Sequence, residues 1–449
     1  MEIAAAISQL LRGPQYPDRE FVRGGATFGE VYAMAAWLRQ ELADPALRNI
    51  PVCLAAENKA IIAAALLASL AGGPSLLLPY AFSGKVLARM QQTTRYTIAV
   101  SEVDREFPEG VKTLRPQPGD TTQIPVDEGA SLHDELLKVF TGGSTGTPQV
   151  WSKTAENIFG ECLYQAEKFA VTEHDCIMAT IPAYHIYGLL FSVGVPLVSS
   201  AAVVDQTPTF PQEIAQVAKE RGVTILASVP VHYRVLREVQ IDSPLRFALS
   251  SAGMLEVVDN EAFCHNNNTG VVEIYGSTET GGVATRNRSL GEEFLTPFAT
   301  VDWKVIDGRL AVRSPYISPD LEVDEHGFYL AGDRVEIKKE NCFALKGRAD
   351  SVTKVGGKRV DLEEIRLLIK KEPGVTDCVV LALPESGGRE HQIGALIQGQ
   401  VIDTESIRRM LSDSLEPYAV PRRIRVVDAI PVKDNGKYDR AGIVLLLQQ

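Results

Sequence analysis

Short apolar runs alternate with helical patterns along the first half of the chain. Residues 52–56 are wholly apolar and predict a strand buried on both faces, and residues 59–70 predict a helix. Strands of this kind that alternate with helices are typical of parallel sheets covered on both sides, so we predict an α/β fold. The other predicted strands are residues 75–78, 96–100, 177–181, 201–204, 224–229, 247–250 and 271–275, with further helices at 84–91 and 211–221.

The pattern changes in the last third of the chain. Tight turns at Asp307-Gly308 and His326-Gly327 predict a small β-rich region around Tyr329. The predicted elements after it are a hairpin at 352–360, helices at 362–371 and 404–414, and strands at 376–383, 392–398 and 424–427. We therefore predict a large N-terminal domain of parallel sheets over residues 1–349 and a small α+β domain over residues 350–449.

Length and charge support this division. The chain has 449 residues, of which 45% are hydrophobic, and this length favours two or more domains. The formal net charge of −12 argues against nucleic acid as a main partner, because a phosphate backbone attracts basic surfaces. From Asp350 onward basic and acidic residues are equal in number, which favours a separate domain with its own partner surface.

The cysteines and the apolar segments indicate the cellular compartment and whether the chain spans a membrane. None of the six cysteines forms a C-x-x-C pair or has a His at metal-ligand spacing, so we predict reduced cytoplasmic thiols and no zinc site. The N-terminus lacks a basic region before its apolar stretch, which argues against a signal peptide. Gly72-Gly73-Pro74 interrupts the apolar segment 60–79, so we predict a buried helix and strand there instead of a membrane span.

A glycine- and hydroxyl-rich loop follows a predicted strand at residues 139–148. Small residues expose backbone N–H groups and hydroxyls, which suits the loop to wrapping phosphate oxygens. The spacing does not fit a Walker A loop, and a flexible surface turn is the alternative. The candidate phosphate contacts are Thr141, Gly142, Gly143, Ser144, Thr145, Gly146 and Thr147.

Further motifs place polar residues where strands end. In residues 273–282 a strand ends in a turn that carries Glu279, a candidate Mg²⁺ ligand, because Mg²⁺ favours a few protein oxygens together with phosphate. A solvated turn glutamate is the alternative. Asp333 in residues 329–334 is able to accept hydrogen bonds from two ribose hydroxyls. Two more motifs follow, Gly347-Arg348-Ala349-Asp350 before residues 354–358, and a turn at residues 431–440 that presents a lysine.

In this order and spacing the motifs resemble the adenylate-forming superfamily. That superfamily includes acyl-CoA synthetases, aryl-CoA ligases, peptide-synthetase adenylation domains and firefly-type luciferases. The resemblance implies that the protein activates a carboxylic acid with ATP and Mg²⁺ to an acyl-AMP, with release of pyrophosphate. It also implies transfer of the acyl group to a thiol, either of CoA or of the phosphopantetheine of a carrier protein.

The resemblance assigns roles to individual positions. Glu279 binds Mg²⁺, and Lys437 stabilises the adenylation transition state, where negative charge builds on phosphate oxygens. Asp350 is the hinge that makes the small domain mobile, and Gly357 lies where the pantetheine tunnel forms. The other implied ATP and AMP contacts are Ser251, Ala252, Gly253, Tyr275, Gly276, Ser277, Thr278, Asp333 and Arg348.

The implied acid pocket is aromatic. Tyr184, His185, Tyr187 and Gly188 match the layout of hydroxycinnamate and benzoate ligases, with His185 in the gate position as a catalytic candidate. A hydrogen-bonded core histidine is the alternative for His185. The aspartate that pairs with an α-amino group in peptide synthetases has no clear counterpart. We therefore expect an aryl or acyl acid.

Departures from the family pattern affect the loop and the acceptor. The loop ends with Gln149 where the family has lysine, and Lys153 is the alternative source of that charge. The chain is also shorter than the family habit, as in short ligases that load a carrier protein. Arg422, Arg423 and Arg425 form a basic run that suits a carrier protein or CoA, with a solvated charged face as the alternative. Other readings of the fold are a luciferase-like monooxygenase and a non-catalytic nucleotide-binding regulator.

Overall fold

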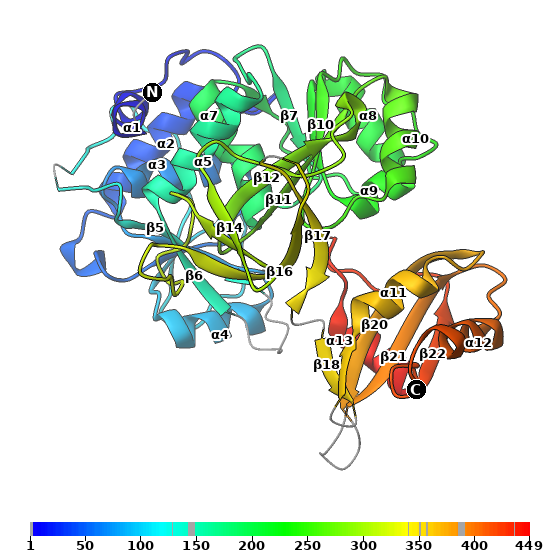
Figure 1. The fold of residues 1–449 in the computed structure, drawn as a ribbon. Helices are drawn as coiled ribbons and strands as arrows, with labels where there is room; N and C mark the ends of the chain where they lie inside the picture. The colour runs from blue at the N-terminus through cyan, green and yellow to red at the C-terminus, as the bar shows by residue number, and fades with distance from the viewer. Residues whose placement is uncertain are drawn as a thin grey trace. The chain divides into compact units, whose positions relative to one another are not determined.

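The chain divides into two units, and the second includes the segment 303–312 from the middle of the sequence. The computed structural model describes residues 3–127, 129–141, 149–339, 341–349, 352–355, 358–384, 391–434 and 436–449. The first unit is Met1–Asp302 with Arg313–Glu322, and the second is Trp303–Val312 with Val323–Gln449 (Figure 1). Asp350 lies outside the described residues, so the predicted boundary at 349/350 stays a prediction.

The first sheet of the first unit carries the strands beside the predicted phosphate loop. Its strand order is β4-β3-β1-β2-β5-β6, in which all neighbours are parallel except β5 and β6. Helix α3 packs against α2 and is buried at every position, as its mostly apolar sequence predicted, and the buried residues include Lys59 and Ser69. The strands are β1 Val52–Leu54, β2 Leu76–Leu78, β3 Ile98–Val100, β4 Lys112–Leu114, β5 Glu135–Thr141 and β6 Gln149–Thr154.

The second sheet has parallel strands at its centre. Its order is β13-β12-β11-β10-β9-β7-β8, and the strands from β11 to β8 run parallel, while β12 and β13 are antiparallel. Parallel central strands present their carboxyl ends along one edge, where α/β proteins bind ligands. The strands are β7 Cys176–Ala179, β8 Ala202–Val203, β9 Ile225–Ser228, β10 Phe247–Ser250, β11 Val271–Ser277, β12 Gly281–Asn287 and β13 Thr296–Pro297.

Helices separate these strands in the sequence (Figure 1). Helix α5 begins with a capping box in which Thr154 and Asn157 bond each other's backbone N–H groups, and α8 ends at Gly222 with φ of 62°. The helices are α1 Ile3–Leu11, α2 Phe28–Glu41, α3 Lys59–Leu70, α4 Gly84–Thr94, α5 Ala155–Lys168, α6 Ile186–Leu189, α7 Val195–Ser199, α8 Pro211–Arg221, α9 Pro230–Val235 and α10 Val257–Asn267. Short 3-10 turns lie at Pro45–Leu47 and Arg288–Leu290, and one π turn lies at Leu190–Gly194.

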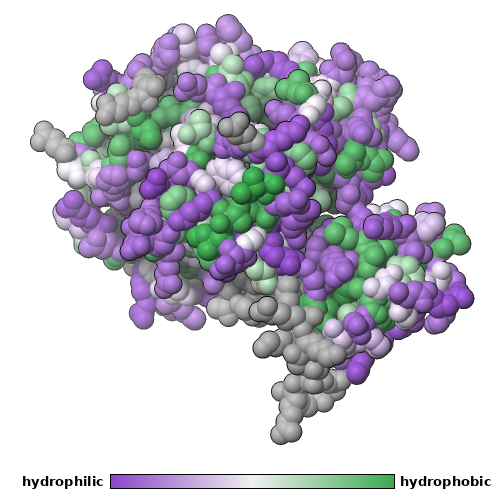
Figure 2. All heavy atoms as spheres, in the orientation of Figure 1, coloured by the Kyte–Doolittle hydropathy of each residue, from purple (hydrophilic) through white to green (hydrophobic). Residues whose placement is uncertain are grey.

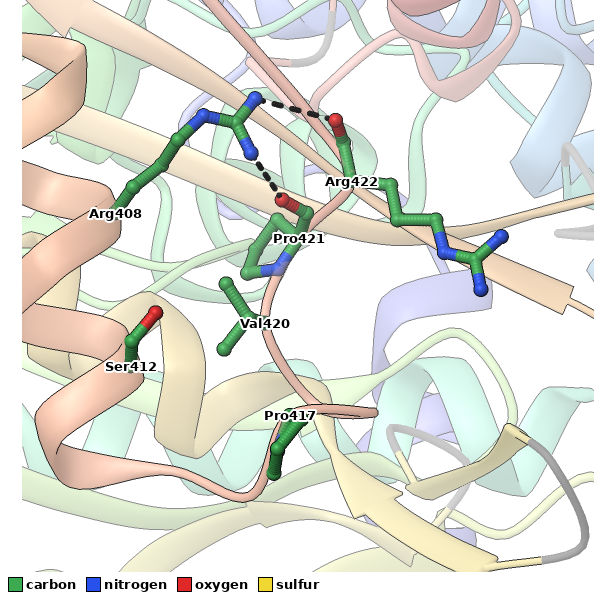
Figure 3. A pocket seen from close by; sticks show the side chains of 6 residues that line it. All are labelled: Arg408, Ser412, Pro417, Val420, Pro421 and Arg422. Carbon is green, nitrogen blue, oxygen red and sulfur yellow. Dashed lines mark hydrogen bonds between the residues drawn. The ribbon is translucent and has the colours of Figure 1, made fainter.

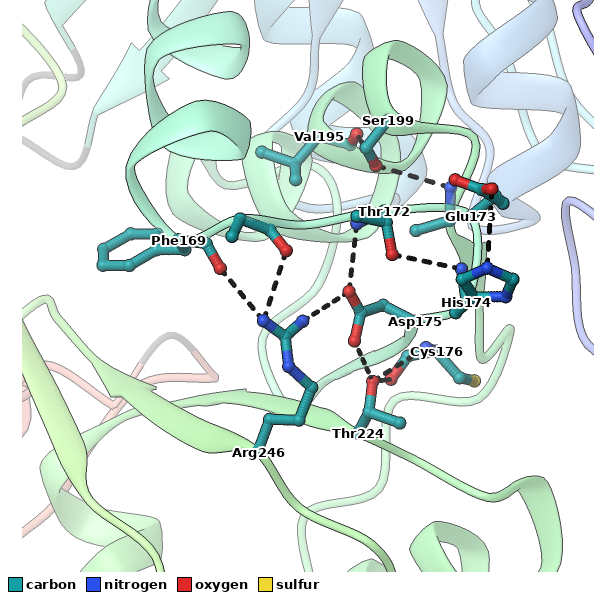
Figure 4. A network of polar contacts seen from close by, with 12 residues as sticks. Phe169, Thr172, Glu173, His174, Asp175, Cys176, Val195, Ser199, Thr224 and Arg246 are labelled. Atoms are coloured by element: carbon teal, nitrogen blue, oxygen red, sulfur yellow. Dashed lines mark hydrogen bonds and ion pairs between the residues drawn. The ribbon is translucent and has the colours of Figure 1, made fainter.

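A polar network joins the amino-terminal ends of three strands of the second sheet (Figure 4). Asp175 is 2% exposed and precedes β7. Its carboxylate accepts hydrogen bonds from Thr224 Oγ1 at 2.7 Å, Thr172 N at 3.0 Å and Arg246 Nη1 at 2.5 Å. Because Thr224 precedes β9 and Arg246 precedes β10, one buried carboxylate fastens three strands at the edge away from their carboxyl ends.

The second unit contains three small sheets. The first sheet has the strand order β14-β15-β16-β17. The second is the pair β18 and β19, and in the third β21 lies between β20 and β22. The core of the last sheet includes Ile365, Cys378 and Ile397, all fully buried. The elements are β14 Asp302–Ile306, β15 Arg309–Arg313, β16 Tyr329–Ile337, β17 Phe343–Arg348, β18 Val352–Val355, β19 Lys358–Asp361, α11 Leu362–Ile369, β20 Val375–Pro384, β21 His391–Gly399, α12 Thr404–Ser414, β22 Arg423–Val427 and α13 Arg440–Gln448.

These sheets confirm the predicted α/β class with a smaller α+β part. The helices predicted at 59–70, 211–221 and 404–414 and the strand at 247–250 match the observed bounds. All six cysteines are free thiols, and four of them are buried. Among the described helices, none combines the length and apolar character that crossing a bilayer requires. Hydrophilic side chains cover most of the face in Figure 2.

Candidate active site

The strands that flank the predicted phosphate loop form an antiparallel pair. Thr141 ends β5 and pairs with Gln149 at the start of β6. The loop positions Gly142, Gly143, Ser144, Thr145, Gly146 and Thr147 lie outside the described residues, so their phosphate contacts stay predictions. Gln149 is exposed at the point where β6 leaves this loop.

Lys153 on β6 points into the protein. Its side chain is 1% exposed, and Nζ donates to the carbonyl oxygens of Glu279 at 3.1 Å and Tyr316 at 2.8 Å. Burial lowers the pKa of Lys153 to about 8, while the nearby carboxylates of Glu161, Glu279 and Asp320 act in the opposite direction. The ammonium group is thus engaged with main-chain carbonyls of the interior.

The turn that carries Glu279 is braced by its own hydroxyl groups. Ser277 N donates to Thr280 Oγ1 and Thr280 N donates to Ser277 Oγ, both at 3.2 Å. The Glu279 carboxylate is half-buried and has no hydrogen bond or ion pair among the described residues. An unpaired carboxylate on a braced turn fits one protein ligand of Mg²⁺, which keeps its other sites for water and phosphate oxygens.

The positions implied to contact adenine meet at the ends of two neighbouring strands. Ser251 follows β10, and its Oγ donates to the carbonyl of Ile274 on β11 at 2.9 Å. Ala252 and Gly253 are exposed, and Ala252 has φ of 68°. Tyr275 on β11 is half-exposed, beside an irregularity in the pairing of β11 with β12.

Two positions next to this edge complete the nucleotide set in the first unit. A Cβ atom on Gly276 would lie 2.3 Å from the carbonyl oxygen of Gly281, so only glycine fits between these two strands. Thr278 is half-exposed on the turn that carries Glu279. The structure thus brings Ser251, Tyr275 and the Glu279 turn to one edge of the sheet.

The implied acid pocket is a cluster of aromatic rings. Tyr184 lies 4.7 Å from His185 and 5.1 Å from Phe82, measured between ring centroids. Tyr187 lies 5.4 Å from Phe191 by the same measure. His185 is half-buried and precedes α6, so it is not enclosed in the core.

A glycine shapes this corner of the fold. A Cβ on Gly188 would come within 2.1 Å of the carbonyl oxygen of Pro182. The first turn of α6 therefore packs directly on the segment before it. Burial raises the pKa of Tyr187 far above its usual value, so its hydroxyl stays protonated.

The buried histidine of the first unit is His232, which the sequence analysis missed. His232 on α9 is 8% exposed, and its Nδ1 lies 2.8 Å from Thr180 Oγ1. Thr180 Oγ1 lies 2.8 Å from Ser228 Oγ, and both hydroxyls are fully buried where β7 and β9 end. Hydroxyl residues at the ends of parallel strands are a sequence signal that could have predicted this hydrogen-bonded group of Thr180, Ser228 and His232.

Two implied site residues of the second unit lie side by side. Asp333 on β16 and Arg348 on β17 are paired in register, with Oδ1 and Nη1 3.7 Å apart. A Cβ on Gly332 would lie 2.8 Å from Arg348 Nη2, so glycine leaves room for the guanidinium. Asp350 and Gly357 lie outside the described residues, and their roles stay predictions.

Lys437 is exposed on a small hairpin of the second unit. Lys433 N donates to the carbonyl of Lys437 at 2.8 Å, and Val432 bridges Tyr438. The Tyr438 hydroxyl lies 2.9 Å from both carboxylate oxygens of Asp377, which is 3% exposed. The residue next to Lys437 is therefore anchored to the buried start of β20.

Two of the three clustered arginines bind a helix end. Arg423 Nη1 donates to the carbonyl of Leu447 at 2.8 Å, and Arg425 Nη1 donates to that of Leu446 at 2.6 Å. They satisfy the last carbonyls of α13, where helices favour cations. This geometry favours the structural alternative for these two residues.

Arg422 lies beside a hollow of about 300 Å³ (Figure 3). Arg408 donates to the carbonyls of Pro421 and Arg422 at 3.1 and 3.2 Å, and the Arg422 side chain points away from Arg408. The hollow is lined by Arg408, Ser412, Pro417, Val420, Pro421 and Arg422.

Known proteins resemble this chain in sequence and in fold. The p-hydroxybenzoic acid–AMP ligase of Mycobacterium tuberculosis is 28% identical over 337 residues, 68% of this chain and 48% of that protein. The mitochondrial malonate–CoA ligase of Homo sapiens is 22% identical over an alignment of 510 residues, 94% of this chain and 88% of that protein. ATP-bound MatB from Rhodopseudomonas palustris has a TM-score of 0.83 at 19% identity, covering 99% of this chain and 98% of that one.

These matches confirm the resemblance to the adenylate-forming superfamily, and their coverage and identity determine how much they show about this chain. The chain spans about half the length of the first of these relatives. The solved structure supports the fold alone, because its identity is low. Residues 14–316, more than half of the chain, match the family described as AMP-binding enzyme. The chain therefore belongs to the AMP-binding enzyme family.

Proposed function

We propose that this protein is an acid–thiol ligase that activates a carboxylic acid with ATP and passes the acyl group to a thiol. The observation that carries the proposal is the Glu279 turn, whose carboxylate has no hydrogen bond or ion pair among the described residues and lies at the same sheet edge as Ser251 and Tyr275. A nucleotide and a metal need these groups together. In a member of the AMP-binding enzyme family, this arrangement favours catalysis over regulatory nucleotide binding.

The first half-reaction forms the acyl-AMP. A carboxylate oxygen of the acid attacks the α-phosphorus of ATP, and the bond to the pyrophosphate oxygen breaks. The acid is already an anion, so no general base is required. Glu279 would hold Mg²⁺, which when bound neutralises charge on the phosphates. Lys437 donates to the oxygens where charge builds in the transition state.

The remaining assignments place the nucleotide and the second substrate. We assign adenine to Ser251, Ala252, Gly253 and Tyr275, the α-phosphate to Thr278, and the ribose hydroxyls to Asp333 with support from Arg348. In the second half-reaction the thiol sulfur attacks the acyl carbonyl carbon, and AMP leaves with the bonding electron pair. The sulfur proton passes to solvent.

The acid is assigned to the aryl class. Tyr184, which contacts Phe82, and Tyr187 are the aromatic residues assigned to the pocket, and a planar acid such as a hydroxybenzoate or hydroxycinnamate suits aromatic surroundings. One relative is itself a p-hydroxybenzoic acid–AMP ligase. Medium-chain acyl acids are the second candidate class.

ATP–pyrophosphate exchange against benzoates, cinnamates and fatty acids tests this assignment. We expect exchange with an aryl acid and a large loss in Glu279→Gln. Strong exchange with octanoate and none with any aryl acid would overturn the aryl assignment. Absence of exchange with every acid would count against the ligase function.

The acceptor is assigned to a carrier protein, with free CoA as the second candidate. One relative is a dimodular nonribosomal peptide synthase of Bacillus subtilis. Arg423 and Arg425 bind α13, so the proposed acceptor surface is reduced to Arg422 and its surroundings. Efficient turnover with CoA and none with carrier proteins would reverse the assignment of the acceptor.

The protein is assigned to the cytoplasm, because its free cysteines suit a reducing compartment.

A further inference from the structure

We propose that Lys153 is a positioning residue for Glu279, and that it acts on the main chain of the turn without touching substrate. The inference rests on the proposed role of Glu279 as the Mg²⁺ ligand. Lys153 stands where an apolar residue could fill the same interior space, yet it places a cationic group beneath this turn. An ammonium group is stable in the interior only when its N–H groups are bonded, so the bonded carbonyls define its position.

Three chain segments meet at the carbonyl oxygen of Glu279. This oxygen accepts from Lys153 Nζ at 3.1 Å and from Ser318 N at 2.8 Å. Lys153 Nζ also donates to the carbonyl of Tyr316 at 2.8 Å, and Ser318 Oγ donates to the carbonyl of Ser152 at 2.9 Å. Strand β6, the Glu279 turn and the segment 314–322 are therefore tied together at one point.

A buried carboxyl group holds the other end of the turn. Glu161 on α5 is 3% exposed, and its Oε1 accepts from Gly282 N at 2.9 Å. A Cβ on Gly281, whose φ is 67°, would lie 2.6 Å from Glu161 Oε2. The turn from Ser277 to Gly282 thus lies between Lys153 at Glu279 and Glu161 at Gly282.

The position of Lys153 on β6 gives this contact a role in catalysis. Strand β6 begins at Gln149, directly after the predicted phosphate loop, and ends one residue after Lys153. Through Lys153, the strand that leaves the loop is bonded to the residue proposed to hold the metal. Partners that orient a metal ligand typically contribute about 10- to 100-fold to metal affinity or activity.

The test is the Mg²⁺ dependence of ATP binding and of exchange in Lys153→Met. We expect the half-saturating Mg²⁺ concentration to rise about 10- to 100-fold, with the KM for the acid little changed. Calorimetry of ATP binding with and without Mg²⁺ should show the same loss of metal dependence. Thioester formation from supplied acyl-AMP should be retained, because that step does not use the pyrophosphate-bound metal.

Two further variants keep the test decisive. Lys138→Met is the matched control, because Lys138 lies on the neighbouring strand β5, is bonded to Glu135 at 2.6 Å and forms no hydrogen bond with the turn among the described residues. Lys153→Gln can donate to one of the two carbonyls and should give an intermediate rise, which covers the case that Lys153→Met does not fold. Wild-type Mg²⁺ dependence in a folded Lys153 variant overturns the inference and leaves the ligase function intact. Absence of exchange in the wild type counts against the function itself.

Discussion

His232 is neutral in the folded protein because its imidazole is buried against Thr180. Burial lowers the pKa of His232 to about 4, whereas an unfolded histidine titrates near 6.5. Between these values the unfolded chain binds a proton that the folded chain does not. Folding stability therefore falls as pH drops from about 6.5 towards 4, by about 1.4 kcal/mol per pH unit within that window.

Replacing His232 by asparagine should remove this acid sensitivity. The asparagine amide could still pair with Thr180 but would not titrate, so stability lost between pH 7 and pH 5 should shrink by about 2 kcal/mol. Thermal unfolding of both proteins at the two pH values measures the difference. His174→Asn, at an exposed histidine, is the control and should behave as wild type. Equal pH dependence in wild type and His232→Asn would contradict a neutral, buried His232.

For Gln149 and Lys153, the residue types alone did not show which way each side chain points. The sequence left open whether Lys153 replaces the lysine that the family has at position 149. Spacing could not decide this, because the direction of a side chain depends on which face of β6 packs against the segment 314–322. The structure directs Lys153 inward to the carbonyl oxygens of Glu279 and Tyr316, while Gln149 is exposed at the start of β6.

Introducing the missing cation should strengthen ATP binding. Gln149→Lys is expected to lower the KM for ATP several-fold, because an exposed lysine beside the predicted loop would attract its phosphates. Steady-state exchange at varied ATP measures this change. Gln216→Lys on α8 adds the same charge at another exposed position and should leave the KM unchanged. A large loss of activity in Gln149→Lys would show that the loop is misaligned with the family motif.

The Asp175 network joins β7, β9 and β10, whose other ends lead to the predicted acid-pocket segment, Ser228 and Ser251 (Figure 4). Sequence periodicity predicted these strands, because each is apolar on both faces. It could not predict their order in the sheet, since pairing depends on contacts between residues far apart in the chain. Thr224 and Arg246 lie 49 and 71 residues from Asp175, beyond the reach of local patterns.

Asp175→Ala should destabilise the first unit strongly. The change removes the carboxylate that accepts from the Thr172 N–H, the Thr224 hydroxyl and Arg246 Nη1, and losses of this kind amount to about 3 kcal/mol. The midpoint of thermal or urea unfolding measures the effect. Asp242→Ala removes an exposed carboxylate that pairs with Lys219 and should leave the midpoint unchanged. Similar midpoints for both variants would contradict a structural role for the network.

At the scale of the molecule, the two units divide the proposed machinery. Glu279, Ser251 and Tyr275 belong to the first unit, while Asp333, Arg348 and Lys437 belong to the second. Motif order along the chain predicted both groups. The second unit contains β16 and most of β15, whereas the sequence predicts the domain boundary at 349/350, beside the predicted hinge Asp350.

The division of labour between the units gives a test that separates the half-reactions. In the proposed mechanism Lys437 acts on charge that develops only when the acyl-AMP forms, so Lys437→Ala should lower pyrophosphate exchange by about 10²–10³-fold. It should still convert supplied acyl-AMP to thioester. Lys433→Ala is the matched control, because Lys433 is exposed on the same hairpin and contributes only its main chain to the contact with Lys437.

That hairpin is anchored through Tyr438 and Asp377, so removing the Lys437 side chain should leave the fold of the second unit intact. Equal losses in both half-reactions for Lys437→Ala would contradict a role confined to adenylation, and loss in Lys433→Ala as well would point to damage of the hairpin instead.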